Sequence, residues 1–164
     1  MNSTIAFLLL LAATSSCASG STALVGPSDL VGHWRCGPVV MRGPGLTVTA
    51  SEEIAREEAG NYVSYGTTLV EAQGRAPVTL KDRSSGTWKL EDGILNIQVL
   101  RAEILSTSDP DVTMESAQRA QDAQLKKKSI YQDRIFEYTR VRYRTIPVNA
   151  MYKQAEVEQS CERI

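Results

Sequence analysis

The dipeptide Asp92-Gly93 stands between two short runs in which apolar and polar residues alternate, and this pattern limits the fold more than any other feature of the chain. Asp-Gly is typical of the two-residue type I′ turn that joins the strands of a β-hairpin. The register that follows pairs Glu91 with Ile94, Leu90 with Leu95 and Trp88 with Ile97. One face of the hairpin is then apolar and the other polar, as in the wall of an antiparallel sheet or barrel.

Turn signals recur at short intervals through the rest of the chain, which favours a β-meander. They are Gly43-Pro44-Gly45, Gly60-Asn61, Gly74, Ser84-Ser85-Gly86, Asp92-Gly93 and Asp109-Pro110. Besides the two strands of the 86–99 hairpin, we predict strands at 31–41, 46–56, 62–70, 78–82, 130–146 and 152–161, which makes eight. For 46–59 a short helix is an alternative, because Thr49 and Glu52 have the spacing of a capping box.

One segment lacks strand alternation and predicts a helix. Residues 112–128 are rich in Ala, Gln, Glu and Lys, Asp111 precedes them as a helix cap, and lysines gather at their end. The apolar face is thin, so we expect a peripheral helix on the surface. The predicted fold is therefore all-β, an antiparallel meander forming a small barrel with one peripheral helix.

The N-terminus predicts export. Residues 5–13 form a short uncharged apolar run, small polar residues follow, and no charged side chain appears before Asp29. This is the pattern of a secretory signal peptide, and the apolar run is too short to span a bilayer. We assign residues 1–20 to the signal and 21–164 to a single domain. The segment 14–17 resembles a lipobox that ends at Cys17, so lipidation of Cys17 and removal of Cys17 by cleavage after Ala18 or Gly20 both stay open. The predicted location is the periplasm or, for a lipoprotein, the outer membrane.

Either form of processing leaves Cys36 and Cys161 as the only pair of free cysteines. Because exported proteins mature in an oxidising compartment, we predict a disulfide bond between these two residues. The bond would join the start of the domain to its last strand.

The charged residues give few signs of chemistry. The net charge is -1, which does not point to nucleic acid. A single histidine, His33, and the absence of ligand spacings give no basis for a metal, a cofactor or an enzyme. Four glutamates at 52, 53, 57 and 58 are expected to be surface acids. Residues 117–144 carry 3 acidic and 8 basic side chains, and alternation would place Phe136, Tyr138 and the arginines at 140, 142 and 144 on one strand face.

Two short motifs carry a resemblance to a known family. Asp29-Leu30-Val31-Gly32-His33-Trp34 resembles the G-x-W entry of lipocalins and related bacterial lipocalin-like proteins, and Gly86-Thr87-Trp88-Lys89-Leu90 resembles the GTW hairpin of those bacterial domains. The resemblance implies a calycin-like barrel with Trp34 and Trp88 in the core of the barrel floor. It also implies a basic partner for Trp34, either Arg163 or an arginine of 140–144.

Two functions are consistent with these features. The resemblance implies a small, mostly apolar ligand in the barrel mouth, since a barrel of eight strands can hold one such molecule. The uneven charge favours an alternative, an envelope protein that binds another protein, such as an inhibitor or an assembly accessory, through its arginine-bearing face.

Overall fold

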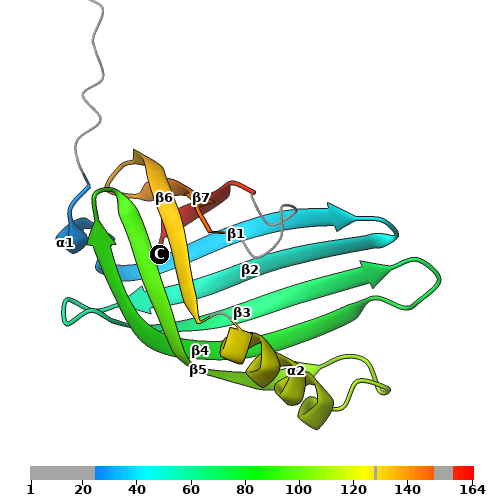
Figure 1. Cartoon of the computed structure of the whole chain (residues 1–164). Helices are drawn as coiled ribbons and strands as arrows, with labels where there is room; N and C mark the ends of the chain where they lie inside the picture. Colours follow the sequence, from blue (N-terminus) through cyan, green and yellow to red (C-terminus); the bar gives the residue numbers. More distant parts are fainter. Residues whose placement is uncertain (1–24, 128, 150–156) are drawn as a thin grey trace, which may run out of the picture.

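The computed structural model describes residues 25–127, 129–149 and 157–164, which form eight antiparallel strands and two helices. The elements are α1 (Pro27–Leu30), β1 (Gly32–Gly43), β2 (Leu46–Arg56), β3 (Asn61–Ala72), β4 (Val78–Glu91), β5 (Ile94–Thr107), α2 (Met114–Lys127), β6 (Ile130–Tyr138), β7 (Arg142–Pro147) and β8 (Gln159–Arg163). The strands follow chain order around a closed barrel, and β8 returns to pair with β1 (Figure 1). This confirms the predicted all-β meander barrel with a peripheral helix.

The hairpin of β4 and β5 has the predicted register. Glu91 pairs with Ile94, Leu90 with Leu95, and Trp88 with Ile97. Asp92 and Gly93 have φ angles of 51° and 75°, the positive values that a type I′ turn requires. The preferred strand at 46–56 is also confirmed, so the capping-box spacing does not start a helix there.

Two divisions between strands were predicted wrongly, and the predicted last strand at 152–161 begins only at Gln159, with residues 152–156 outside the described residues. Ser84-Ser85-Gly86, expected as a turn, lies within β4, where a bulge shifts the register with β5 and the strand continues. Glycine is needed at 86 for close approach, because a Cβ there would collide with the backbone carbonyl of Gln98. The second error is the single long strand at 130–146, which is two strands joined by a turn. In that turn the Thr139 amide donates to the Arg142 carbonyl over 2.7 Å. The count of eight strands is right because these two errors cancel.

The barrel is closed by strands on all sides at one end only. The closing ladder of β1 with β8 spans Trp34 to Cys36, and that of β5 with β6 spans Ile94 to Gln98. Beyond these ladders β1 to β5 continue as a curved sheet, which Figure 1 shows as the long strands that extend away from α1. The far half of the molecule is therefore an open trough.

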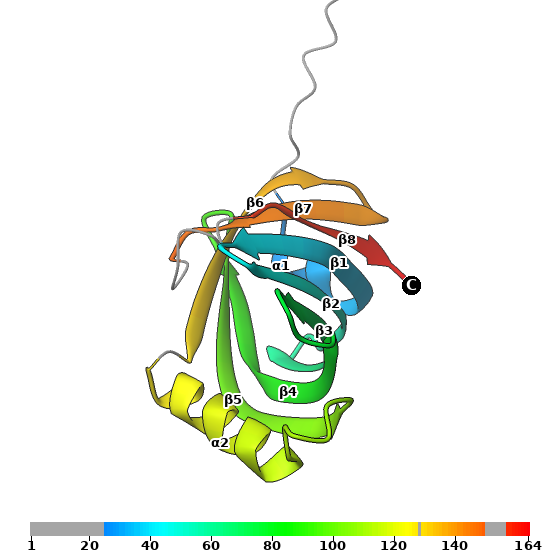
Figure 2. The same cartoon turned by 90° about the vertical axis from the view of Figure 1, so that its right-hand side faces the viewer.

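Helix α2 lies along the β5 edge of this trough, beside the second half of β5 (Figure 2). The Gln118 side chain accepts a hydrogen bond from the Ile104 amide over 2.8 Å and donates one to the Ala102 carbonyl over 3.0 Å. One side-chain amide thus bonds the backbone groups that a neighbouring strand would otherwise pair. None of the described residues of α2 is fully buried, in agreement with its predicted surface position.

Candidate functional site

The closed end of the barrel is sealed by α1 and by the residues around Trp34. The indole nitrogen of Trp34 donates to the Leu30 carbonyl over 2.9 Å, and the indole is fully buried. The Arg163 guanidinium lies 4.3 Å from the centre of the Trp34 ring and donates to the backbone carbonyls of Asp29 and Val31. Arg163 is therefore the basic partner of Trp34, and these described residues fill this end of the barrel.

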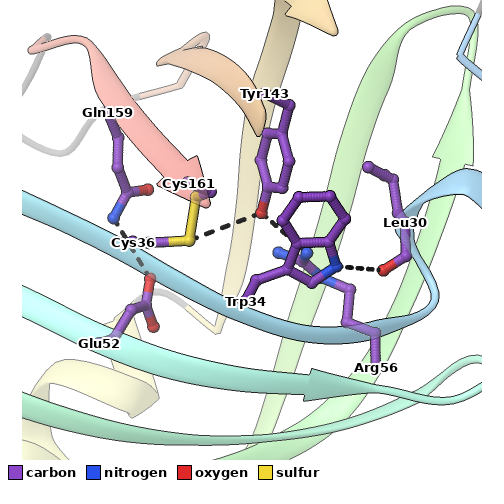
Figure 3. The surroundings of a disulfide bond; sticks show 8 residues. All are labelled: Leu30, Trp34, Cys36, Glu52, Arg56, Tyr143, Gln159 and Cys161. Atoms are coloured by element: carbon purple, nitrogen blue, oxygen red, sulfur yellow. Dashed lines mark hydrogen bonds between the residues drawn. A yellow bond between two sulfur atoms is a disulfide. The ribbon is translucent and has the colours of Figure 1, made fainter. Parts of the chain in front are cut away.

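A second layer of buried side chains lies above this floor (Figure 3). The disulfide of Cys36 and Cys161 is present, which confirms the prediction. The Tyr143 hydroxyl lies 3.6 Å from the Cys36 sulfur and accepts a hydrogen bond of 2.8 Å from Arg56. Arg56 is only 4% exposed, so a positive charge is held inside the barrel. Trp88 is buried in the same core cluster.

Above this layer the interior becomes polar and hollow. A cavity of about 270 Å³ opens into the trough between the sheet and α2. It is lined by Ala50, Ser51, Glu52, Ser64, Gly66, Thr68, Asp82, Ser84, Val99, Gln121, Leu125, Tyr131 and Gln159. Most of these residues offer a hydroxyl, an amide or a carboxylate, whereas Val99 and Leu125 supply apolar contact. The cavity is the candidate functional site.

The two carboxylates of the cavity belong to one row across the sheet. Glu52 on β2 pairs with Gly66 on β3, and Gly66 pairs with Asp82 on β4. Directly paired residues place their side chains on the same face, and neighbouring strands lie about 4.8 Å apart. A Cβ at Gly66 would collide with the Asp82 carboxylate, so that carboxylate occupies the space over the glycine. Glu52 and Asp82 therefore lie on either side of a glycine whose inner face is covered by the Asp82 carboxylate.

The protein environment disfavours the charged form of both acids. Burial raises the pKa of Glu52 above its ordinary value of 4.5, and the nearby negative charges of Asp133 and Asp82 raise it further. The positive charge of Arg56 and a hydrogen bond of 3.4 Å from Gln159 oppose this rise in pKa. Burial likewise raises the pKa of Asp82. Both carboxylates would gain from a positive partner in the cavity.

Hydroxyl groups line the side of the cavity nearer the floor. Ser64 and Ser84 face each other on β3 and β4 with their oxygens 2.9 Å apart. The Tyr62 side chain is 6% exposed, and within the described part of the chain its buried hydroxyl has no partner at hydrogen-bond geometry. Burial raises the pKa of Tyr62, and both Ser84 and Glu52 are close enough to influence it. A buried polar group of this kind costs free energy unless another group satisfies it.

The prediction of a surface position was wrong for Glu52. Glu53 does lie on the outside, where it pairs with Arg35 over 2.9 Å, but Glu52 points into the barrel. The signal was present in the sequence, because Glu52, Ile54 and Arg56 share one face of a strand and Ile54 is an apolar core residue. The four clustered glutamates at 52, 53, 57 and 58 were interpreted together as surface acids, so the alternation of Glu52, Ile54 and Arg56 was not used.

The predicted arginine face does not form. Arg140 lies in the turn between β6 and β7, and a bulge between Ile135 and Glu137 breaks the alternation along β6. Arg144 stacks on Phe136 at 5.0 Å and forms ion pairs with Glu137 and Glu158. Because Arg144 is engaged within its own chain, these residues do not present a row of free positive charge.

The predictions for the N-terminus, for metals and for membrane spans compare with the described residues as follows. Cys17 and the predicted signal lie outside the described residues. Among residues 25–127, 129–149 and 157–164 no cluster of histidine, cysteine and acidic side chains is suited to hold a metal ion. Within the same ranges neither helix has the length and apolar character needed to cross a bilayer.

Comparison with protein-family models and with curated proteins gives no match for this chain. The family resemblance of the two tryptophan motifs therefore stays a prediction.

Proposed function

We propose that this protein binds a small molecule in the cavity between the barrel and α2, as an exported protein similar to lipocalins. The observation that carries the proposal is the internal cavity, which is sealed at the Trp34 end and opens into the trough at the other. Ligand sites in proteins are concave and combine apolar walls with a few polar groups that set orientation. Pockets for drug-sized ligands begin at about 300 Å³, so a cavity of about 270 Å³ suits a smaller molecule.

The lining favours a polar ligand over the mostly apolar one that the family resemblance implies. An apolar molecule would cover Glu52 and Asp82 without offering a hydrogen bond to either, and a buried polar group without a partner destabilises the complex. Val99, Leu125 and Tyr131 leave room for a short apolar portion. The alternative of a protein partner at the arginines has no comparable support, since Arg144 is paired within the chain.

Native mass spectrometry tests the proposal on processed protein isolated gently from its own cell envelope. We expect a small molecule that leaves on denaturation, and the mature mass identifies the cleavage site and any acyl group on Cys17. A matched pair of variants tests the location. Ser84→Leu fills the cavity and should abolish binding, whereas Ser85→Leu, whose side chain does not line the cavity, should retain it. Equal ligand retention by both variants would place the ligand elsewhere and overturn the proposal.

A further inference from the structure

Three hydroxyl groups lie next to one another on the inner face of β3 and β4. Ser64 and Ser84 are directly paired with their oxygens 2.9 Å apart, and Tyr62 is two residues before Ser64 on the same strand face. Ser64 is 4% exposed and Tyr62 is 6% exposed. The bond between the serines is the one hydrogen bond that these three side chains form with the described residues. Two of the three O–H donors therefore lack an acceptor.

The next row towards the mouth of the cavity has the opposite need. It contains Glu52 and Asp82, and an ionised carboxylate only accepts hydrogen bonds. Glu52 accepts one long bond of 3.4 Å from Gln159. The Asp82 carboxylate lies over Gly66 and accepts no bond from a side chain in the described part of the protein. One row of the cavity thus has unused donors, and the row beside it has unused acceptors.

The charge around the two acids does not select a ligand. Glu52 and Asp82 also border a neighbouring hollow of about 550 Å³, which is lined by Arg35 and Lys81 as well. Positive charge near these acids is therefore supplied by the protein. The hydrogen-bonding groups of the two rows are the more specific guide to the ligand.

From these two rows we infer that the ligand is a neutral polyhydroxylated molecule of the size of one sugar ring, with a hydroxyl group between the serines and the acids. The inference rests on the proposed function and specifies the ligand class of the same cavity. A hydroxyl both accepts and donates, so it can accept from Ser84 and donate to Asp82. An ammonium cannot accept from the serine, and a carboxylate cannot donate to the acid.

The spacing of the rows suits a single hydroxyl. Successive residues on one face of a strand are about 6.7 Å apart. One oxygen with a hydrogen bond of about 2.8 Å on each side spans about 5.6 Å, which is close to that separation. Ser84 is near enough to Tyr62 to influence the pKa of its hydroxyl. Once Ser84 donates to the ligand, its oxygen can accept from Tyr62, and the bonds run from Tyr62 through Ser84 and the ligand to Asp82.

The rest of the lining favours several hydroxyls over one. Thr68 lies in the row beyond the acids, and Gln121 and Gln159 contribute side-chain amides. Hydroxyls and amides both donate and accept, as the groups of a polyol do. Val99 and Leu125 are available to the carbon atoms of a ring. The cavity of about 270 Å³ is smaller than pockets for drug-sized ligands, which agrees with one ring.

Ring-matched probes test the inference by isothermal titration calorimetry of the disulfide-intact mature protein at pH 7.5. The neutral polyols are D-glucose, D-galactose, D-mannose and myo-inositol. Cyclohexanol has the same ring size with one hydroxyl, D-glucosamine adds a positive charge and D-glucuronate adds a negative one. We expect at least one neutral polyol to bind at least tenfold more tightly than cyclohexanol. Neither charged sugar should bind more tightly than the best neutral polyol.

Variants identify the groups responsible. Ser84→Ala should reduce the affinity for the best polyol about fivefold and Asp82→Asn about tenfold, since bonds to charged acceptors are stronger. Ser85→Ala is the matched control, because Ser85 neighbours Ser84 on the opposite strand face and does not line the cavity. Tyr62→Phe should also weaken polyol binding. It should leave the urea midpoint of the free protein unchanged or raised, because its hydroxyl has no partner there.

The outcomes separate the two proposals. If cyclohexanol binds as tightly as the best polyol, or if a charged sugar binds more tightly than every neutral one, the inference is overturned and the cavity remains a ligand site. If Ser84→Ala and Asp82→Asn both retain wild-type affinity, the assignment to these two rows is wrong. If no probe binds, the inference is overturned. A molecule that copurifies in native mass spectrometry then retains the proposed function, and an empty protein refutes both.

Discussion

Replacement of both disulfide cysteines by alanine should remove a large part of the stability of this protein. The bond joins residues separated by 125 positions, and the chain-entropy relation for such a loop gives about 16 cal/mol/K, or about 5 kcal/mol at 25 °C. Cys36 and Cys161 are 0% and 1% exposed, so the lost sulfur contacts add to the cost. Since domains of this size are stable by roughly 5 to 15 kcal/mol, the double variant should be marginally folded.

Urea unfolding followed by tryptophan fluorescence provides the measurement, with Trp34 and Trp88 as probes in the core. The Cys36→Ala, Cys161→Ala double variant should show a lower midpoint and a steeper dependence on urea, because its unfolded chain exposes more surface. Reduced wild-type protein is the control and should lose a similar free energy. A loss below about 1 kcal/mol with an unchanged slope would refute the reasoning, since the cross-link would then not restrict the unfolded chain.

Three other substitutions test separate parts of the structure. Folding raises the pKa of Glu52, so the contribution of this residue to the free energy of unfolding is fully present below its ordinary pKa of 4.5 and is lost as the pH rises through its pKa in the folded protein. Glu52→Gln should therefore be more stable than wild type at pH 8. In urea unfolding experiments the difference in stability should vanish near pH 4. Trp34→Ala should cost about 3 to 5 kcal/mol in the same assay, and a loss below 1 kcal/mol would argue against its position in the floor. Gln118→Leu should cost about 1 to 2 kcal/mol and speed hydrogen exchange at the Ile104 amide, whereas Gln124→Leu on the exposed side of α2 should change neither.

The local parts of the fold could be predicted from the sequence. The hairpin register follows from Asp92-Gly93 and strict alternation, because a slip of one residue would expose Trp88 and Leu95 together. The disulfide was predicted from the expected export, because the predicted removal or acylation of Cys17 leaves Cys36 and Cys161 as a pair. The strand boundary predicted at Gly86 was wrong, because this glycine lies within a strand, where it allows the backbone of a neighbouring strand to approach closely, and does not form a turn.

The candidate site depends on contacts between distant residues and was largely missed. Glu52 and Asp82 are 30 positions apart, and only the registers of two ladders place them in one row. Each acid by itself resembles an ordinary surface residue. The role of Gly66 between these two acids becomes clear only when its partners on the neighbouring strands, Glu52 and Asp82, are known.

The contact between Gln118 and β5 has a consequence for how the protein behaves at high concentration. A strand with free backbone groups is a template on which a second molecule can extend the sheet, and such growth leads to aggregates. The amide of Gln118 occupies two of those groups, and α2 covers the adjoining edge. The helix is therefore expected to hinder the addition of a second molecule at the β5 edge of the trough.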